Sequence, residues 1–168
     1  MIYTGIGSRD TPGPIKDAMR SVGRFMATWG HTLRSGAARG ADSAFEDGCD
    51  SVQGEKEIYL PFRGFSRSTS ELYGTCKEAR MLAKEFHPNW AILGDTARDF
   101  MGRNCYQVLG PSLRTPTDFI ICWTPGGKVV GGTGQALRMA EHYRIPVFNL
   151  GSMSLDEAND EITKLLIP

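Results

Sequence analysis

The sequence predicts a single α/β domain over residues 1–168, built as a doubly wound, mostly parallel sheet of about five to seven strands with helices on both faces. Short apolar segments alternate along the chain with segments of helical periodicity. The apolar segments lack polar alternation, as in Asp118-Phe-Ile-Ile-Cys122, and strands of that kind are covered on both faces. Right-handed crossovers then bring the strand ends, and the turns that follow them, to one edge of the sheet.

Five segments are expected to form the strands. Each is a short apolar run that ends at a turn or at a helix start, and they cover residues 2–7, 31–34, 57–61, 117–123 and 145–150.

Helical patterns connect these strands. Asp10-Thr11-Pro12 supplies a start signal for the first helix, which continues to about Trp29 with apolar positions at Ile15, Met19, Val22, Phe25 and Met26. Further helices are expected over residues 41–52, 70–86, 95–109 and from the second glycine-rich turn to 143, with His87-Pro88-Asn89-Trp90 dividing the third from the fourth. Ser154-Leu-Asp-Glu157 is a capping box that opens a C-terminal helix.

Composition narrows the function classes. With 40% hydrophobic and 23% charged residues, 168 residues are enough for one domain with a core. The net charge of zero disfavours nucleic acid as a partner, although 13 of the 19 basic residues are arginine, which suits phosphate contacts. No leader or membrane-spanning stretch is recognised, so we expect a cytoplasmic protein. The four cysteines and three histidines have no metal-ligand spacing, and we expect no metal, disulfide or cofactor.

Two glycine-rich turns carry the strongest signal for function. Ser35–Asp42 and Pro125–Gln135 each follow an apolar segment and open a helical pattern. Glycine lets the backbone approach a ligand closely, and N–H groups at the positive start of a helix bind phosphate. Two such turns in one small domain predict a nucleotide-type small molecule as the ligand.

The candidate ligand-binding residues lie in three strand-to-helix turns and on one helix. They are Gly7, Ser8, Arg9, Ser35, Gly36, Arg39, Asp42, Arg103, Asn104, Gly126, Gly127, Gly131, Gly132, Thr133, Gly134 and Gln135. Asn104 falls on the apolar stripe of its helix, where a polar amide needs partners, whereas Arg103 lies off that stripe. For Asp42, contact with ribose hydroxyls and simple helix capping are both open.

These motifs resemble two families of one superfamily. Ser35-Gly-Ala-Ala-Arg-Gly-Ala-Asp42 resembles the S-G-x-A-x-G-[IA]-D turn of the DNA-processing protein A family. Met101-Gly-Arg103-Asn104, followed by an apolar strand and Pro125-Gly126-Gly127, is similar to the M-x-x-R-K and P-G-G-x-G-T-x-x-E motifs of the Lonely Guy phosphoribohydrolases. Both belong to the SLOG superfamily, so the resemblance, from Gly5 to Asn149, implies a Rossmann-like nucleotide-binding fold and a homo-oligomer. The whole pattern looks most like small stand-alone proteins that bacteriophages often encode.

One departure from the Lonely Guy pattern bears on the chemistry. That family acts on an N-glycosidic bond with the helix arginine, which matches Arg103 here, and with the glutamate of G-T-x-x-E. At the position of the glutamate this chain has Arg138 or Ala136, depending on how the glycines are aligned. Cleavage of a glycosidic bond generally uses a carboxylate. A relocated carboxylate would have to come from Asp42, Glu46 or Glu141, and Glu46 also fits a helix-capping box.

Three functions are therefore expected, in decreasing order of support. The first is binding of a nucleotide or an ADP-ribose-like metabolite for sensing or sequestration. In a bacteriophage, such binding would serve counter-defence against the host. The second is a Lonely Guy-like N-glycosidase acting on nucleoside 5′-monophosphates, with Arg103 and Glu46 as candidate catalytic residues. The third is a DNA-processing-like recombination mediator that binds single-stranded DNA, which the zero net charge disfavours.

Overall fold

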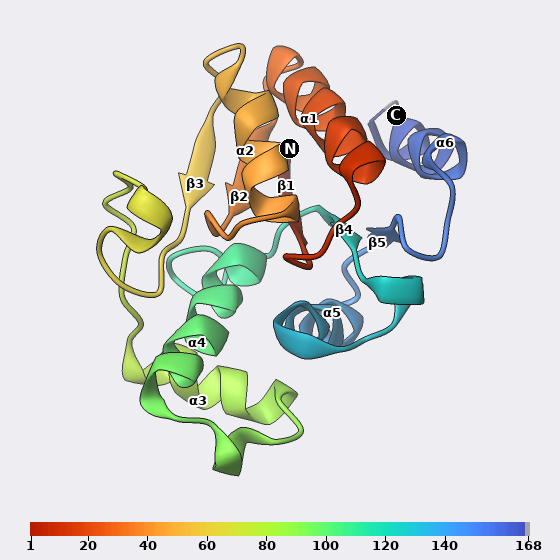
Figure 1. Cartoon of the computed structure of the whole chain (residues 1–168). Helices are drawn as coiled ribbons and strands as arrows, with labels where there is room; N and C mark the ends of the chain where they lie inside the picture. The colour runs from red at the N-terminus through yellow and green to blue at the C-terminus, as the bar shows by residue number, and fades with distance from the viewer. Residues whose placement is uncertain (167–168) are drawn as a thin grey trace.

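A five-stranded sheet with all strands parallel forms the centre of the computed structural model, which describes residues 1–166 (Figure 1). The strand order is β3-β2-β1-β4-β5. The strands are β1 (Ile2–Gly7), β2 (Thr32–Ser35), β3 (Lys56–Ile58), β4 (Phe119–Trp123) and β5 (Val147–Asn149). Because the order reverses between β1 and β4, the ends of these two strands form the switch point of the sheet. The predicted doubly wound α/β class is confirmed.

Helices cover both faces of the sheet. One core contains residues of α1 (Gly13–Thr28), α2 (Ala41–Asp50) and α6 (Leu155–Leu166). The other contains residues of α3 (Lys77–Phe86), α4 (Asp95–Leu109) and α5 (Gly131–Tyr143). Short 3₁₀ turns lie at Phe65–Arg67, Trp90–Ile92 and Pro125–Gly127. No helix within residues 1–166 is long and apolar enough to cross a membrane.

Alternate residues of the central strands supply the two cores. In β4, Phe119 and Ile121 pack with α1, α2 and α6, while Ile120 and Cys122 pack with α4 and α5. The same alternation places Tyr3 of β1 in the first core and Ile6 in the second. This two-sided burial explains why the strands are apolar throughout.

Two glycines allow α1 and α2 to pack closely. A Cβ at Gly23 would lie 2.5 Å from the carbonyl oxygen of Phe45, and one at Gly48 would overlap the carbonyl oxygen of Arg20. The aromatic ring of Phe45 fills the space above Gly5 of β1, where a Cβ would come within 2.6 Å of the ring. The first helical layer therefore lies directly against the centre of the sheet.

The prediction of a helix over residues 70–86 is wrong at its start, because α3 begins only at Lys77. The preceding residues pair with the chain beyond β3 instead: the Leu60 amide donates to Leu72 (2.8 Å) and the Gly74 amide donates to Leu60 (3.0 Å). This pairing also replaces the end of the strand expected over 57–61. Phe25, one of the apolar positions of the predicted first helix, is 51% exposed.

Candidate functional site

A cavity of about 390 Å³ opens at the switch point between β1 and β4. The turn after β1, the start of α2, the middle of α4, the residues after β4 and the first turn of α5 form its walls. The lining residues are Ile6, Gly7, Ser8, Arg9, Asp10, Ala38, Asp42, Phe100, Met101, Arg103, Asn104, Gln107, Thr124, Pro125, Val130, Gly131, Gly132, Thr133 and Ala136. Ligands of open parallel sheets bind in this position, outside the carboxyl ends of the strands.

The first turn of α5 presents unpaired backbone donors to the cavity. Within residues 1–166, the amides of Gly131, Gly132 and Thr133 donate to no backbone or side-chain acceptor. The first amide of this helix that makes a hydrogen bond is that of Gly134, which donates to Val130 (2.9 Å). Val130 gives the helix no side-chain cap. We call Gly131, Gly132 and Thr133 the anion cradle, because free amides at the positive end of a helix favour a bound anion.

The turn after β1 also lines the cavity. Ser8 is fixed by its amide, which donates to Trp123 (3.0 Å), and its hydroxyl accepts a hydrogen bond from the Asp10 amide (3.1 Å). Arg9 is exposed at the rim, with its guanidinium carbon 5.8 Å from the centre of the Phe100 ring. Gly40, at φ +102°, lies against this turn, where a Cβ would come within 2.5 Å of the Ser8 carbonyl oxygen.

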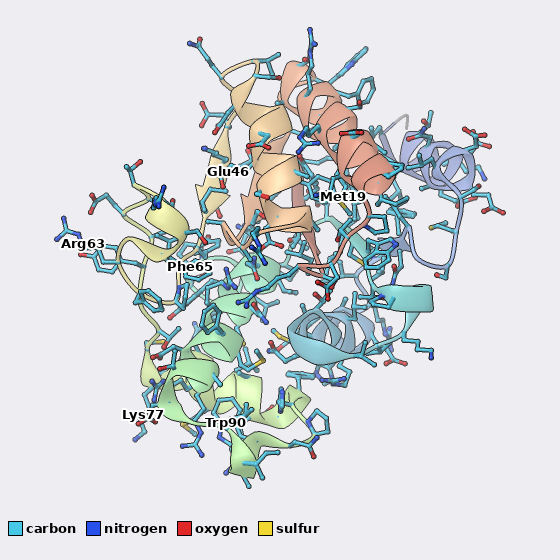
Figure 2. The ribbon with its side chains drawn as sticks, in the orientation of Figure 1. Met19, Glu46, Arg63, Phe65, Lys77 and Trp90 are labelled. Atoms are coloured by element: carbon cyan, nitrogen blue, oxygen red, sulfur yellow. The ribbon has the colours of Figure 1, made fainter. Side chains whose placement is uncertain are left out.

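Arg103 is a buried residue of the cavity lining and ties three segments together. Its Nη1 donates to the carbonyl oxygens of Gly36 and Tyr59, the latter at 3.2 Å, and its Nε donates to Asn104 Oδ1 (3.2 Å). Its guanidinium lies over the rings of Phe65 and Phe100, at 5.9 and 5.7 Å from their centres; Figure 2 labels Phe65. Burial lowers the pKa of Arg103, and the negative charge of Asp42 opposes that effect. The arginine therefore has a structural role in addition to lining the cavity.

The glycine of the first motif makes room for this arginine. A Cβ at Gly36 would overlap Arg103 Nη1 and would lie 2.6 Å from Arg103 Cζ. Gly36 does not line the cavity, so its small size serves Arg103 rather than close approach of a ligand. Ser35 is likewise buried, and its hydroxyl donates to the Gly5 carbonyl oxygen (2.6 Å).

Asp42 is the buried carboxyl group of the cavity, with 4% of its surface exposed. Burial raises its pKa to about 6 from an ordinary 3.8, while the charge of Arg103 and the backbone amides of Ala38 and Gly7 act in the opposite direction. Titration near neutral pH in a cavity is a property of acid–base groups at functional sites. Asp10, the other acid lining the cavity among residues 1–166, is exposed at the rim.

Gln107 lines the same cavity but was not among the predicted site residues. It is 2% exposed, and its Nε2 has no hydrogen-bond partner among residues 1–166. Its position four residues after Arg103 places both side chains on one face of α4, which is the sequence signal that identifies it. We call Asp42, Arg103 and Gln107 the polar floor. Phe100 was missed as well, although it lies one turn before Asn104 on the same helix.

Four of the predicted residues support the cavity from behind and do not line it: Gly126, Gly127, Gly134 and Gln135. Asn104 lines the cavity and donates to the Gly132 carbonyl oxygen (3.1 Å) and to Gln135 Oε1 (3.0 Å), so buried Gln135 fixes α4 against α5. Gly134 packs against Val129, and Gly127 packs against Ser152. Gly126, at φ +59°, shapes the 3₁₀ turn outside the cavity.

Arg39 and Glu46 lie elsewhere. Both line a second, more open depression of about 620 Å³ between α2 and residues 66–69. Glu46 is ion-paired with Lys56 of β3 (2.8 Å), and Figure 2 labels it on α2. Glu141 is exposed on α5 and does not line the cavity. Of the three acids considered as a relocated carboxylate, the structure therefore brings only Asp42 together with Arg103.

No protein-family model and no curated protein matches the sequence. Among solved structures, the chain is similar to the Moco carrier protein of Chlamydomonas rheinhardtii, at 18% identity and a TM-score of 0.54 over 98% of this chain and 82% of that chain. It is also similar to DNA processing protein A from Helicobacter pylori, described for its single-stranded DNA binding mode, at 17% identity and a TM-score of 0.56 over 98% of this chain and 72% of that chain. These likenesses show a Rossmann-like α/β fold.

Proposed function

We propose that the chain binds a nucleotide or a related metabolite such as ADP-ribose in the cavity at the switch point, and that it acts by holding this ligand. The observation that carries the proposal is the anion cradle at the start of α5, whose three residues line the cavity and whose amides have no acceptor among residues 1–166. Arg9 and Ser8 face the same space from the turn after β1. A phosphate bound there receives backbone hydrogen bonds, the helix dipole and a cation at the rim.

The polar floor supports a ligand with a second, uncharged part. Asp42 is negative above its pKa and repels a phosphate, whereas a sugar or base offers hydroxyl or amide groups that suit it. A ligand with phosphate at one end and a polar uncharged group at the other matches both the anion cradle and the polar floor. Nucleotides have this composition.

We propose that the ligand is held and not cleaved because the glutamate of the Lonely Guy motif is missing from this chain. Ala136 lines the cavity with a methyl group, and Arg138 is turned away, donating to the Phe86 carbonyl oxygen (2.6 Å). Neither supplies a carboxylate to activate water or to stabilise a sugar cation.

Calorimetric titration of nucleoside 5′-phosphates, ADP-ribose and cyclic ADP-ribose tests the proposal. In Gly132→Asp a carboxylate occupies the anion cradle, and the nearest obstacle to its Cβ is the flexible Met101 side chain at 3.3 Å. Acidic residues stabilise a helix start, so this variant should fold. Gly13→Asp makes the same change at the start of α1, where a Cβ meets nothing within 4 Å. We expect Gly132→Asp to abolish binding and Gly13→Asp to retain it. No binding by the wild-type protein would refute the proposal.

N-glycosidase activity on nucleoside 5′-monophosphates is the second candidate, because buried Asp42 and Arg103 line one cavity and Asp42 has a raised pKa. Chromatography of released base tests it. Asp42→Asn should abolish release, whereas Glu46→Gln should not, since Glu46 lies outside this cavity. If the wild-type protein binds nucleotide and releases no base, this candidate is eliminated.

A further inference from the structure

The amide of Gln107 is an unsatisfied donor inside the proposed ligand cavity. Its Nε2 is buried and makes no hydrogen bond among residues 1–166, although most buried polar atoms have a partner. Its neighbours in α4 offer no substitute, because Arg103 is itself a donor and is engaged with carbonyl oxygens. The Gln107 backbone carbonyl accepts from the Thr4 hydroxyl (2.6 Å), which fixes this turn of α4 against β1.

Asp42 is the neighbour of Gln107 that can accept a hydrogen bond. Its carboxylate is an acceptor, and the Gln107 amide is near enough to help keep the pKa of Asp42 down without making a hydrogen bond of normal geometry. Both residues line the cavity, so an acceptor and a donor lie close to each other in its wall. A hydroxyl group satisfies both through one oxygen, because it donates to the carboxylate and accepts from the amide. A phosphate oxygen would only accept, and it would meet the charge of Asp42.

We propose that Gln107 is a specificity-determining residue that, together with Asp42, binds a ribose hydroxyl of the ligand, so that the cavity selects ribonucleotides over deoxyribonucleotides. This inference rests on the proposed nucleotide-binding function and specifies its ligand class. It also explains why a side chain whose Nε2 has no partner among residues 1–166 occupies a buried position of α4: the missing partner comes with the ligand.

The inference can be tested with the wild-type protein alone. Adenosine 5′-monophosphate is compared by calorimetry with its 2′-deoxy and 3′-deoxy analogues, and the guanine, cytosine and uracil ribonucleotides are included. Loss of the hydroxyl leaves the Gln107 donor and the Asp42 acceptor unpaired, so one deoxy analogue should bind about tenfold more weakly. Equal affinity for ribo and deoxy forms would overturn the inference while leaving nucleotide binding intact. A preference for one base that is the same for the ribo and deoxy forms would also overturn the inference. If no nucleotide binds, the proposed function fails and this inference fails with it.

Gln107→Met keeps the side-chain length and removes the donor. We expect this variant to be more stable than the wild-type protein without ligand, yet to bind the ribonucleotide about tenfold more weakly and the deoxy analogue unchanged. Tyr3→Phe is the matched control, because the Tyr3 hydroxyl is also buried and has no partner in the described part of the chain, but belongs to the opposite core. It should gain stability and keep the discrimination between sugars. Unchanged discrimination in Gln107→Met would overturn the role of Gln107.

Discussion

Replacing Gly36 by alanine should destabilise the protein through Arg103. Gly36 does not have a positive φ, so alanine is compatible with the backbone itself. The added Cβ, however, would overlap Arg103 Nη1 and would lie 2.6 Å from Arg103 Cζ and 2.5 Å from Gln107 Nε2, where ordinary contact begins at 3.4 Å. The guanidinium group must therefore retreat, and it loses its hydrogen bonds to the carbonyl oxygens of Gly36 and Tyr59.

The expected cost follows from these two bonds. A hydrogen bond to a charged group contributes about 1.5–3 kcal/mol, so losing two lowers the free energy of unfolding by about 3–6 kcal/mol. A domain of this size loses about 2–4 °C in Tm per kcal/mol, which predicts a fall of about 6–24 °C. Urea denaturation and thermal melts of Gly36→Ala measure this. Gly13→Ala is the control, because a Cβ there meets nothing within 4 Å.

A double-mutant cycle isolates the cause. In an Arg103→Met background the guanidinium is absent, so Gly36→Ala should cost less than half of what it costs in the wild-type protein. If the cost is the same in both backgrounds, Arg103 is not what Gly36 accommodates. If Gly36→Ala is as harmless as Gly13→Ala, the packing of Arg103 against Gly36 is refuted.

Two further predictions concern Asp42 and the packing of the first two helices. The raised pKa of Asp42 means that the folded state binds a proton more tightly than the unfolded state, so ionisation of this group lowers stability as the pH rises from about 4 to 6. The free energy of unfolding of Asp42→Asn, measured by urea denaturation, should therefore rise relative to that of the wild-type protein by up to about 3 kcal/mol between pH 4 and 7.5. A difference that stays constant with pH would contradict this. Gly23→Ala should destabilise the protein despite the better helix propensity of alanine, because its Cβ would lie 2.5 Å from the Phe45 carbonyl oxygen. The control Gly13→Ala should be neutral or stabilising. Equal Tm values for the two variants would contradict the close packing of α1 on α2.

Local patterns in the sequence were enough to predict the layers of the fold. The helix expected over 95–109 matches α4 residue for residue, and the apolar segment ending at Cys122 lies in the centre of the sheet. The segment 70–76 could not be predicted in this way, because its structure depends on pairing with Leu60 and its neighbours. That pairing joins residues about a dozen positions apart and leaves no periodic signal.

The candidate site was predictable in position but not in detail. Glycine-rich turns located the switch point, and Ser8, Asp42, Arg103 and the anion cradle all line one cavity. In the sequence, the turn containing Gly36 resembled a phosphate-binding turn. A glycine indicates that a neighbouring group needs space, but it does not indicate whether that group is a ligand or a side chain of the protein. The structure fills that space with Arg103, which is 67 residues away in the sequence. Contacts of that range depend on the whole fold and cannot be inferred from one motif.

The most direct test of nucleotide binding at the anion cradle is an NMR titration of the ¹⁵N-labelled protein with adenosine 5′-monophosphate. Bound phosphate should hydrogen-bond the free amides of Gly131, Gly132 and Thr133, so their signals should shift most, and inorganic phosphate at higher concentration should shift the same signals. Gly132→Asp should suppress both responses. Largest shifts at the second depression, around Arg67 and Ser68, or no saturable shift in the anion cradle, would contradict the proposed site.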